Sequence, residues 1–238
     1  MRPLLIRAAL SSSVALPHGN DVHLDALLAW VWMLRHHPER VELLARAVQR
    51  ESIIRAHLPI ALVVLGTHAV PLCSAWQFPP NAKLEQTRWT RRKDGEDMEQ
   101  RARSVSPSAP DRPWFARGDC VRTPYVEWTA YGSRREVMKA LELVHQIGGL
   151  RGHGYGTVST WSGSAADHEP AACWAMDGRA MRNLPAEAVE APTVERLAVE
   201  PPYWPPCMQV PAVRAGEHAT LRAEVLELLR DGDGRAGW

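Results

Sequence analysis

Residues 148–156 read GGLRGHGYG, and this glycine loop with the elements on either side of it decides the predicted fold. Five of its nine residues are glycine, with Arg151, His153 and Tyr155 between them. Glycine adopts positive φ readily and lets a ligand approach the backbone closely. Successive backbone N–H groups in such a turn can line up as an anion-binding nest. The loop therefore predicts a site that holds a phosphate, with a cation, an imidazole and an aromatic ring beside it.

The elements on either side decide which kind of glycine loop this is. Ser133 and Glu136 have the spacing of a capping box, and apolar residues at helical spacing follow to Val144, so we expect a helix that stops at Gly148. Residues 157–161 have the composition of a strand. Dinucleotide-binding and P-loop sites need the reverse order, strand then helix. The R-x-x-G-x-G pattern at 151–156 also fits coenzyme A acyltransferases, but it too belongs between a strand and a helix. A tight connection without a ligand remains a further interpretation.

Composition narrows the classes of function. A chain of 238 residues can bury one core, or one domain with a smaller appendage. The formal net charge of +1 excludes a globally basic, histone-like binder, so any nucleic-acid surface must be a local patch. The four cysteines show no C-x-x-C spacing and the histidines no H-x-x-x-H spacing, so we expect no metal and no cofactor. The longest apolar stretch, 58–70, is too short to span a bilayer, and we expect a cytoplasmic protein without a membrane segment.

Working outward from the loop, the sequence predicts an α+β protein. Alternation predicts a strand over 3–10, and an apolar stripe predicts a helix that opens at His23. Further strands are expected at 60–65, 72–78 and 121–131, with a hairpin-like or loop insertion at about 79–118. With the helix, loop and strand described above, residues 1–162 follow the βαββαβ order of the ferredoxin-like (RRM-like) fold. Residues 163–238 form a smaller C-terminal region, with a short strand at 172–176 and a helix over 217–230.

The insertion carries a local excess of positive charge. Between residues 83 and 93, Glu85 stands alone against five cations, and Trp89 lies among them: Lys83, Arg88, Arg91, Arg92 and Lys93. Cations with an interleaved aromatic ring suit single-stranded nucleic acid, because rings stack on bases and arginine binds phosphate. Acidic residues follow directly, so a solvated charged hairpin remains the alternative. Among the histidines, His23 and His153 are the candidates for contacting RNA.

A helix, a glycine loop with an arginine and an aromatic residue, then a strand, all inside a ferredoxin-like unit, resembles the RAMP superfamily of RNA-binding CRISPR subunits. The loop of that superfamily has the form G-x-R/K-x-x-G-Y/F-G, and residues 149–156 match it. Three further stretches are similar to the small subunit of type IV systems that caps the 5′ handle of crRNA: residues 23–30 with the strand before them, 179–185 and 201–204. The resemblance covers most of the chain except the insertion, which corresponds to the family's thumb.

The resemblance implies a non-catalytic subunit that grips the repeat-derived 5′ end of the guide RNA in an antiviral ribonucleoprotein complex. The loop residues would line the RNA backbone: Gly149, Arg151, Gly152, His153, Gly154, Tyr155 and Gly156. The thumb-like insertion would contact the guide through Arg88, Trp89, Arg91, Arg92 and Lys93. The implied partners are crRNA, the backbone and large-subunit-like proteins of the effector and, indirectly, target DNA.

Two enzymatic readings remain beside this one. Relatives with the same fold cut RNA without a metal, and here His153 or His23 would take the proton from a 2′-hydroxyl. No second catalytic partner stands at a recognisable spacing for such an endoribonuclease. A coenzyme A enzyme rests on the R-x-x-G-x-G match alone.

Overall fold

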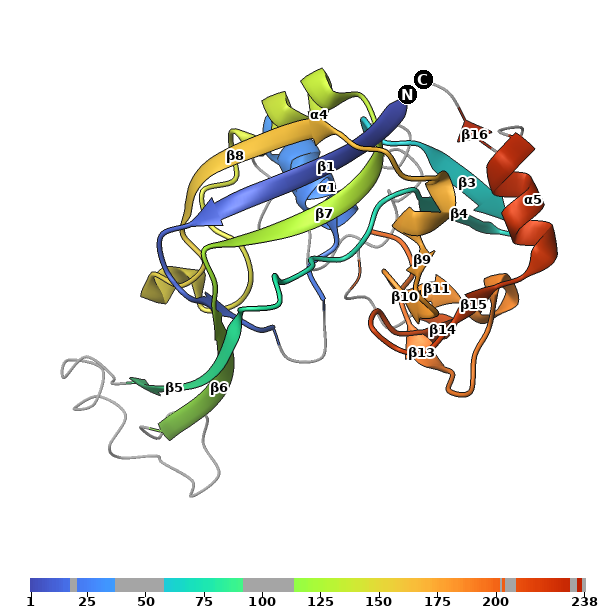
Figure 1. The fold of residues 1–238 in the computed structure, drawn as a ribbon. Helices are drawn as coiled ribbons and strands as arrows, with labels where there is room; N and C mark the ends of the chain where they lie inside the picture. Colours follow the sequence, from blue (N-terminus) through green and yellow to red (C-terminus); the bar gives the residue numbers. More distant parts are fainter. Residues whose placement is uncertain are drawn as a thin grey trace.

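The computed structural model describes residues 1–17, 21–36, 58–91, 114–201, 203, 209–231 and 235–236. They form a mixed α+β fold of antiparallel sheets and helices (Figure 1). The helices are α1 (Leu24–His36), α4 (Arg134–Leu141) and α5 (Ala223–Asp231). The long strands are β1 (Arg2–Leu10), β5 (Lys83–Arg91), β6 (Trp114–Arg122), β7 (Tyr125–Gly132) and β8 (Val158–Ala165). The short strands are β2 (Val14–Ala15), β3 (Leu62–Leu65), β4 (His68–Pro71), β9 (Ala175–Met176), β10 (Arg179–Ala180), β11 (Leu184–Pro185), β12 (Val189–Glu190), β13 (Glu195–Leu197), β14 (Val210–Val213), β15 (Thr220–Leu221) and β16 (Arg235–Ala236).

The central sheet has the order β7-β1-β8, with both pairings antiparallel. Leu4, Ile6 and Ala8 of β1 are buried, whereas the residues between them are not. This period-two burial follows from the pleat, which sends alternate side chains to opposite faces. The strand expected over 3–10 is confirmed.

Residues 73–77 lie along the other edge of β7. Antiparallel bridges join Cys73 to Ala130 and Gln77 to Glu127. This segment occupies a fourth strand position, so the spatial order is β8, β1, β7 and then 73–77. The strand expected at 72–78 is therefore present as a series of bridges, but the one expected at 60–65 pairs with β4 and β16 in another sheet.

Helices α1 and α4 cover the same face of the central sheet (Figure 1). Between helices and sheet lies the first hydrophobic core, which includes Ile6, Leu28, Val126, Trp128 and Leu141. The apolar side chains whose spacing predicts a helix after His23 therefore form the inner face of α1.

Helix α4 is shorter than the sequence suggests. Its N-cap is Ser133, as expected, but the side chain makes no capping hydrogen bond. The helix ends at Leu141 and not at Gly148. The amides of Leu143 and Val144 bond three residues back, and the chain then turns to pair Gln146 with Thr157 just before β8. Pairing with the start of β8 thus replaces the last helical turns.

The arms of the insertion form a long antiparallel hairpin. Strands β5 and β6 pair from Lys83↔Arg122 to Arg91↔Trp114, which confirms the hairpin for the described arms. The strand expected over 121–131 is interrupted, because β6 ends at Arg122 and β7 begins at Tyr125. Pro124 lies at this break and has no N–H to donate to a ladder.

A second hydrophobic core lies beside the first. It combines residues of β3 and β4 with residues from 173–229, including Val63, Val70, Trp174, Leu184 and Leu229. Because β3 and β4 belong to this core, the boundary predicted between residues 162 and 163 does not separate the two cores.

Two C-terminal expectations are corrected. Residues 172–176 are not one strand, since a 3-10 turn at Pro170–Cys173 precedes β9. The last helix begins at Ala223 and not at Glu217, because Thr220 and Leu221 pair with β12 as strand β15.

A buried ion pair joins the elements around the two cores. The side chains of Arg182 and Asp25 are both fully buried, with Nη2 of the arginine 3.3 Å from Oδ2 of the aspartate. Arg182 also donates to the carbonyl oxygens of Pro71 at 2.7 Å and Val199 at 2.8 Å, and to the Tyr203 hydroxyl at 2.6 Å. Burial lowers the pKa of Arg182, but Tyr203 and Asp25 raise it by more, so the guanidinium pKa lies above its ordinary value. The arginine therefore stays charged and links α1 to the second core.

His23 belongs to this buried cluster. Its ring stacks on Tyr203 with centroids 4.3 Å apart and an angle of 7° between the planes. Neither ring nitrogen has a hydrogen-bond partner within the described residues. Burial, helped by the charge of Arg182, lowers the pKa of His23 to about 3. The imidazole is therefore neutral at physiological pH.

In the part of the chain that the structure describes, no helix has the length and apolar character needed to cross a membrane. Cys73, Cys120 and Cys173 are buried free thiols, and Cys207 lies outside the described residues. Burial raises the pKa of the Cys173 thiol to about 12, so it is not a reactive nucleophile.

Replacing Arg182 with methionine should lower the free energy of unfolding by about 3–5 kcal/mol, because Asp25 would be left buried without its cation. Arg7→Met is the matched control. It breaks a 2.6 Å pair with Glu127, but the Arg7 side chain is 45% exposed. We expect the control to lose less than about 1 kcal/mol. Urea unfolding measures both, and equal losses would show that burial of the pair is not decisive.

The stability of the protein should fall as the pH drops from about 6.5 toward about 3. In this window the unfolded chain protonates His23, whereas the folded chain keeps it neutral. The slope from this one group is at most about 1.4 kcal/mol per pH unit. The variant His23→Phe keeps a ring against Tyr203 and should lose this part of the slope, while His153→Phe should not. Urea unfolding at several pH values would refute the assignment if both variants kept the wild-type slope.

Candidate nucleic-acid interface

The two ends of the glycine loop, at Gly148 and Gly149 and at Gly156, pack against the segment that follows β1. The amide of Gly149 donates to the Ala15 carbonyl at 2.8 Å, and the amide of Gly156 donates to the Ser13 carbonyl at 2.8 Å. Gly148 and Gly156 have φ of +79° and +66°. A Cβ on Gly156 would lie 1.8 Å from the Ile147 carbonyl oxygen, and one on Gly148 would lie 2.7 Å from that of Ala15. These glycines are required by the packing of the loop itself.

The middle of the loop, residues 151–154, projects into solvent and forms its tip. Arg151, Gly152, His153 and Gly154 are exposed, and Arg151–His153 form one turn of 3-10 helix. A Cβ on Gly152 or Gly154 would meet no atom within 4 Å. Within the described residues, the amides of Arg151 and Gly152 donate to no acceptor. The tip therefore offers bare backbone, a guanidinium and an imidazole to a ligand.

Tyr155 connects the glycine loop to the hairpin. Its hydroxyl shares a hydrogen bond with the Thr87 hydroxyl in β5, and both side chains are half-buried. In Figure 1 the loop lies between the central sheet and the hairpin. Two patches that the sequence suggests separately are thus brought together.

The hairpin presents its cations on two faces. Side chains alternate along a strand, so Lys83 and Thr87 share one face of β5 and Arg88 lies on the other. Lys83 is directly opposite Arg122 of β6, and paired residues share a face. Lys83, Arg88 and Arg122 are all exposed. The face that carries Thr87, and so meets the loop, therefore carries Lys83 and Arg122.

The remaining thumb candidates are only partly placed. Trp89 and Arg91 belong to β5, but the structure describes only their backbone. Arg92 and Lys93 lie outside the described residues. The site residue that sequence reasoning missed is Arg122. Alternation within β5 can be read from the sequence, but the register with β6 that sets Arg122 opposite Lys83 cannot.

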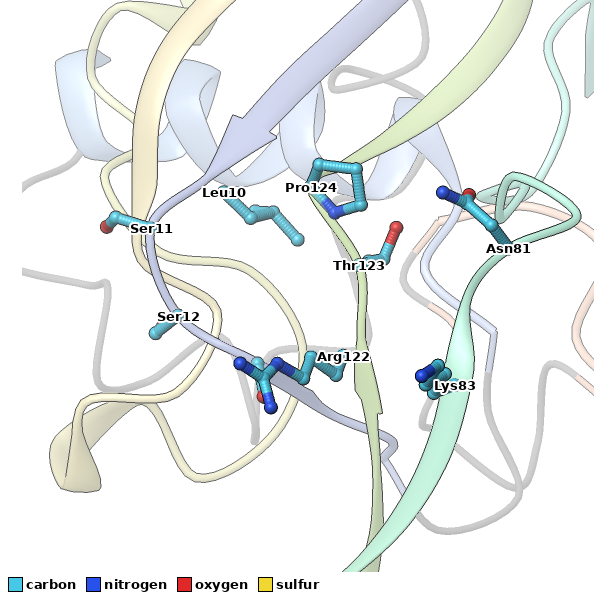
Figure 2. A pocket seen from close by; sticks show the side chains of 9 residues that line it. Leu10, Ser11, Ser12, Asn81, Lys83, Arg122, Thr123 and Pro124 are labelled. Carbon is cyan, nitrogen blue, oxygen red and sulfur yellow. The ribbon is translucent and has the colours of Figure 1, made fainter.

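A cavity of about 600 Å³ opens at the base of the hairpin, where β1 and β6 end (Figure 2). Its lining residues are Leu10, Ser11, Ser12, Ser13, Asn81, Lys83, Arg122, Thr123 and Pro124. The Ser12 hydroxyl accepts a hydrogen bond from the Thr157 amide at 2.9 Å, so this wall of the cavity is fixed to the end of the glycine loop. We call the glycine loop, the hairpin arms and this cavity the loop–hairpin surface.

Arg151 also borders a second cavity, of about 520 Å³, on the helical side of the loop. Trp30 of α1, Leu143 and His145 line it with Arg151. An indole and a guanidinium together suit the face of an unstacked base. One cavity therefore lies at the base of the hairpin, on residues that bond to the end of the loop, and another lies beside the loop tip.

The structure excludes His23 from this surface. Its side chain is 1% exposed and stacks inside the protein on Tyr203. The structure gives no support to the expectation that His23 contacts RNA or acts as a base on it, because a ligand would have to open the core to reach the ring. By contrast, His153 lies at the exposed tip.

Among the described residues, no group of three or more His, Cys, Asp or Glu side chains could hold a metal ion. The charged groups of the loop–hairpin surface are mainly cationic, with Glu85, 4.0 Å from Arg122, and the exposed Asp119 of β6 as acids on the hairpin arms. Such a surface can bind a flexible polyanion. No protein-family model matches the chain, and no match is found among the curated proteins.

The two kinds of glycine should respond differently to an added methyl group. We expect Gly156→Ala to lower the free energy of unfolding by about 2–4 kcal/mol, through the clash with Ile147 and the positive φ. Gly152→Ala should change it by less than about 0.5 kcal/mol. Urea unfolding measures both variants. Similar losses of unfolding free energy would contradict the division of the loop into packed ends and a free tip.

Proposed function

We propose that this chain is a non-catalytic subunit that binds guide RNA and caps the 5′ handle of crRNA in a type IV CRISPR ribonucleoprotein. The observation that carries the proposal is the Tyr155–Thr87 contact. It holds a RAMP-like glycine loop against a basic hairpin, with the exposed tip of the loop next to Tyr155. A single strand of RNA could then contact both elements at once.

The arrangement of the sheet supports the fold that the proposal requires. A ferredoxin-like unit has four antiparallel strands, with its first strand between the fourth and the third and its second strand at the edge. The order β8, β1, β7 and 73–77 fits this pattern, with α1 and α4 on one face. In this reading the β5–β6 hairpin is the thumb, inserted between the second and third strands.

The chemistry of the surface favours single-stranded RNA over a duplex. The cations lie on a narrow hairpin and on a small loop, with one cavity at the base of the hairpin and another beside Arg151 of the loop. Unstacked bases can enter such cavities, whereas a duplex keeps its bases stacked. Phosphate contacts by Lys83, Arg88, Arg122 and Arg151 would make binding strongly salt-dependent.

The proposal places the protein in the cytoplasm, beside the backbone and large-subunit-like proteins of the effector. It contacts target DNA only indirectly, through the guide. Purifying the protein from cells that express a CRISPR array and its effector subunits, and sequencing the bound RNA, tests this directly. Repeat-derived 5′ ends should be enriched, and an unselective RNA population would contradict handle capping.

The double variant Arg88→Ala/Arg151→Ala should bind guide RNA at least about tenfold more weakly at about 0.1 M salt. The slope of log affinity against log salt should also fall by about 0.7 for each lost phosphate contact. The matched control is Arg135→Ala/Lys139→Ala, which removes two exposed cations from α4. Fluorescence anisotropy measures the guide-RNA affinity of the wild type and both variants. Equal losses of affinity in the two variants would show that net charge, and not the position of the cations, determines binding.

The same preparation distinguishes binding from catalysis. We expect repeat RNA to remain intact when incubated with the protein in EDTA. A defined cut that persists in EDTA and disappears in His153→Ala would replace this proposal with a metal-independent endoribonuclease.

A further inference from the structure

The cavity at the base of the hairpin has three kinds of wall. Lys83 and Arg122 supply positive charge, Ser11, Ser12 and Ser13 supply hydroxyls, and Leu10 and Pro124 supply apolar surface. Figure 2 shows the serine segment on one side of β6 and Lys83 on the other, with Arg122 extending toward the serines. An anionic group, a hydroxyl-bearing group and a flat apolar group can therefore be bound together.

The two cations are available to a ligand. Lys83 and Arg122 are paired residues in the β5–β6 ladder, so their side chains leave the same face. The Arg122 side chain is 76% exposed, and its contact with Glu85 is long, at 4.0 Å. A contact of this length and exposure compensates the guanidinium charge weakly. A phosphate is the group that two such neighbouring cations bind well.

The three serines are not equivalent. The Ser11 hydroxyl donates to the Thr157 carbonyl at 3.4 Å, and the Ser12 hydroxyl accepts from the Thr157 amide at 2.9 Å. The half-buried Ser13 hydroxyl has no hydrogen-bond partner within the described residues, although its carbonyl accepts from Gly156. Ser13 is thus the hydroxyl left to recognise a ligand.

We propose that this cavity holds one nucleotide of the bound RNA. Its phosphate lies between Lys83 and Arg122, its ribose 2′-hydroxyl meets Ser13, and its base lies against Leu10 and Pro124. This inference rests on the proposed function and adds a site that discriminates RNA from DNA. A volume of about 600 Å³ is ample for one nucleotide. The 2′-hydroxyl is the group by which a protein distinguishes the two nucleic acids at a given position.

Fluorescence anisotropy with two labelled probes tests the inference: oligouridylate and oligodeoxyuridylate, each of about ten nucleotides. Wild-type protein should prefer the RNA. Ser13→Ala should weaken RNA binding by about five- to tenfold and leave DNA binding unchanged, since only the RNA carries the lost partner. Ser12 is kept intact because its hydroxyl holds the Thr157 amide.

Lys83→Ala/Arg122→Ala should weaken the binding of both probes by at least about tenfold and lower the salt slope by about 0.7, the value for one phosphate. Lys83→Arg/Arg122→Lys keeps both charges and should bind nearly as the wild type does. The control Arg135→Ala/Lys139→Ala should bind as the wild type does. Circular dichroism checks that every variant is folded.

The outcomes separate this inference from the proposed function. If Arg88→Ala/Arg151→Ala loses RNA while Lys83→Ala/Arg122→Ala binds like the wild type, the cavity proposal fails and guide binding stands. If the cation variants behave as expected but Ser13→Ala weakens RNA and DNA equally, the 2′-hydroxyl contact is wrong. If the wild-type protein binds no RNA, both proposals fail.

Discussion

The buried pair of Arg182 and Asp25 is the interaction on which the arrangement of the protein depends. One guanidinium binds the first turn of α1, the carbonyls of Pro71 and Val199, and the Tyr203 hydroxyl. These groups come from segments on both sides of the boundary between the two cores. A charge in this position is stable only when every partner is in place, because an unpaired buried ion is heavily penalised. The pair therefore fixes where α1 and the 73–77 strand meet the C-terminal region, and so fixes one edge of the central sheet.

At the opposite end of the sheet, the described residues form no buried ion pair of this kind, and the glycine loop is fixed there mainly by backbone contacts. Gly149 and Gly156 bond to the segment after β1, and the Ser12 hydroxyl holds Thr157. The packing at its two ends therefore gives the glycine loop a structural role, whatever its exposed tip binds. Gly148 and Gly156 leave no room for a Cβ where the two backbones approach, whereas one on Gly149 would make ordinary contacts and one on Gly152 or Gly154 would meet no atom within 4 Å. Gly154 has a φ of +82° at the end of the 3-10 turn, a conformation that favours glycine, so Gly152 alone of the loop's two exposed glycines has neither packing nor a positive φ that requires it.

Local patterns predicted the parts of the fold that local physics decides. Alternation in Leu4, Ile6 and Ala8 predicted β1, and the order helix, loop, strand around residues 148–156 was correct. The patterns failed where distant segments compete. Helix α4 ends early because residues 145–146 pair with the start of β8, and His23 is buried by Tyr203, a residue 180 positions along the chain. Likewise, the loop residues and the basic strand could be chosen from sequence, but the Tyr155–Thr87 contact and the place of Arg122 depend on register and tertiary packing.

The contact between Tyr155 and Thr87 also bears on how firmly a flexible strand can be held. A single-stranded RNA loses conformational freedom when it binds, so affinity depends on how little the protein must reorganise. A hairpin attached only at its base would leave its cations free to move relative to the loop. The hydrogen bond limits that movement near the cavity, where Lys83 and Arg122 lie. Arg88, on the other face of β5, gains no such restraint from the loop. The alternation of β5 thus divides the hairpin into a face held against the loop and a face without that contact. Under the proposed function, the second face is the one free to meet a separate segment of RNA.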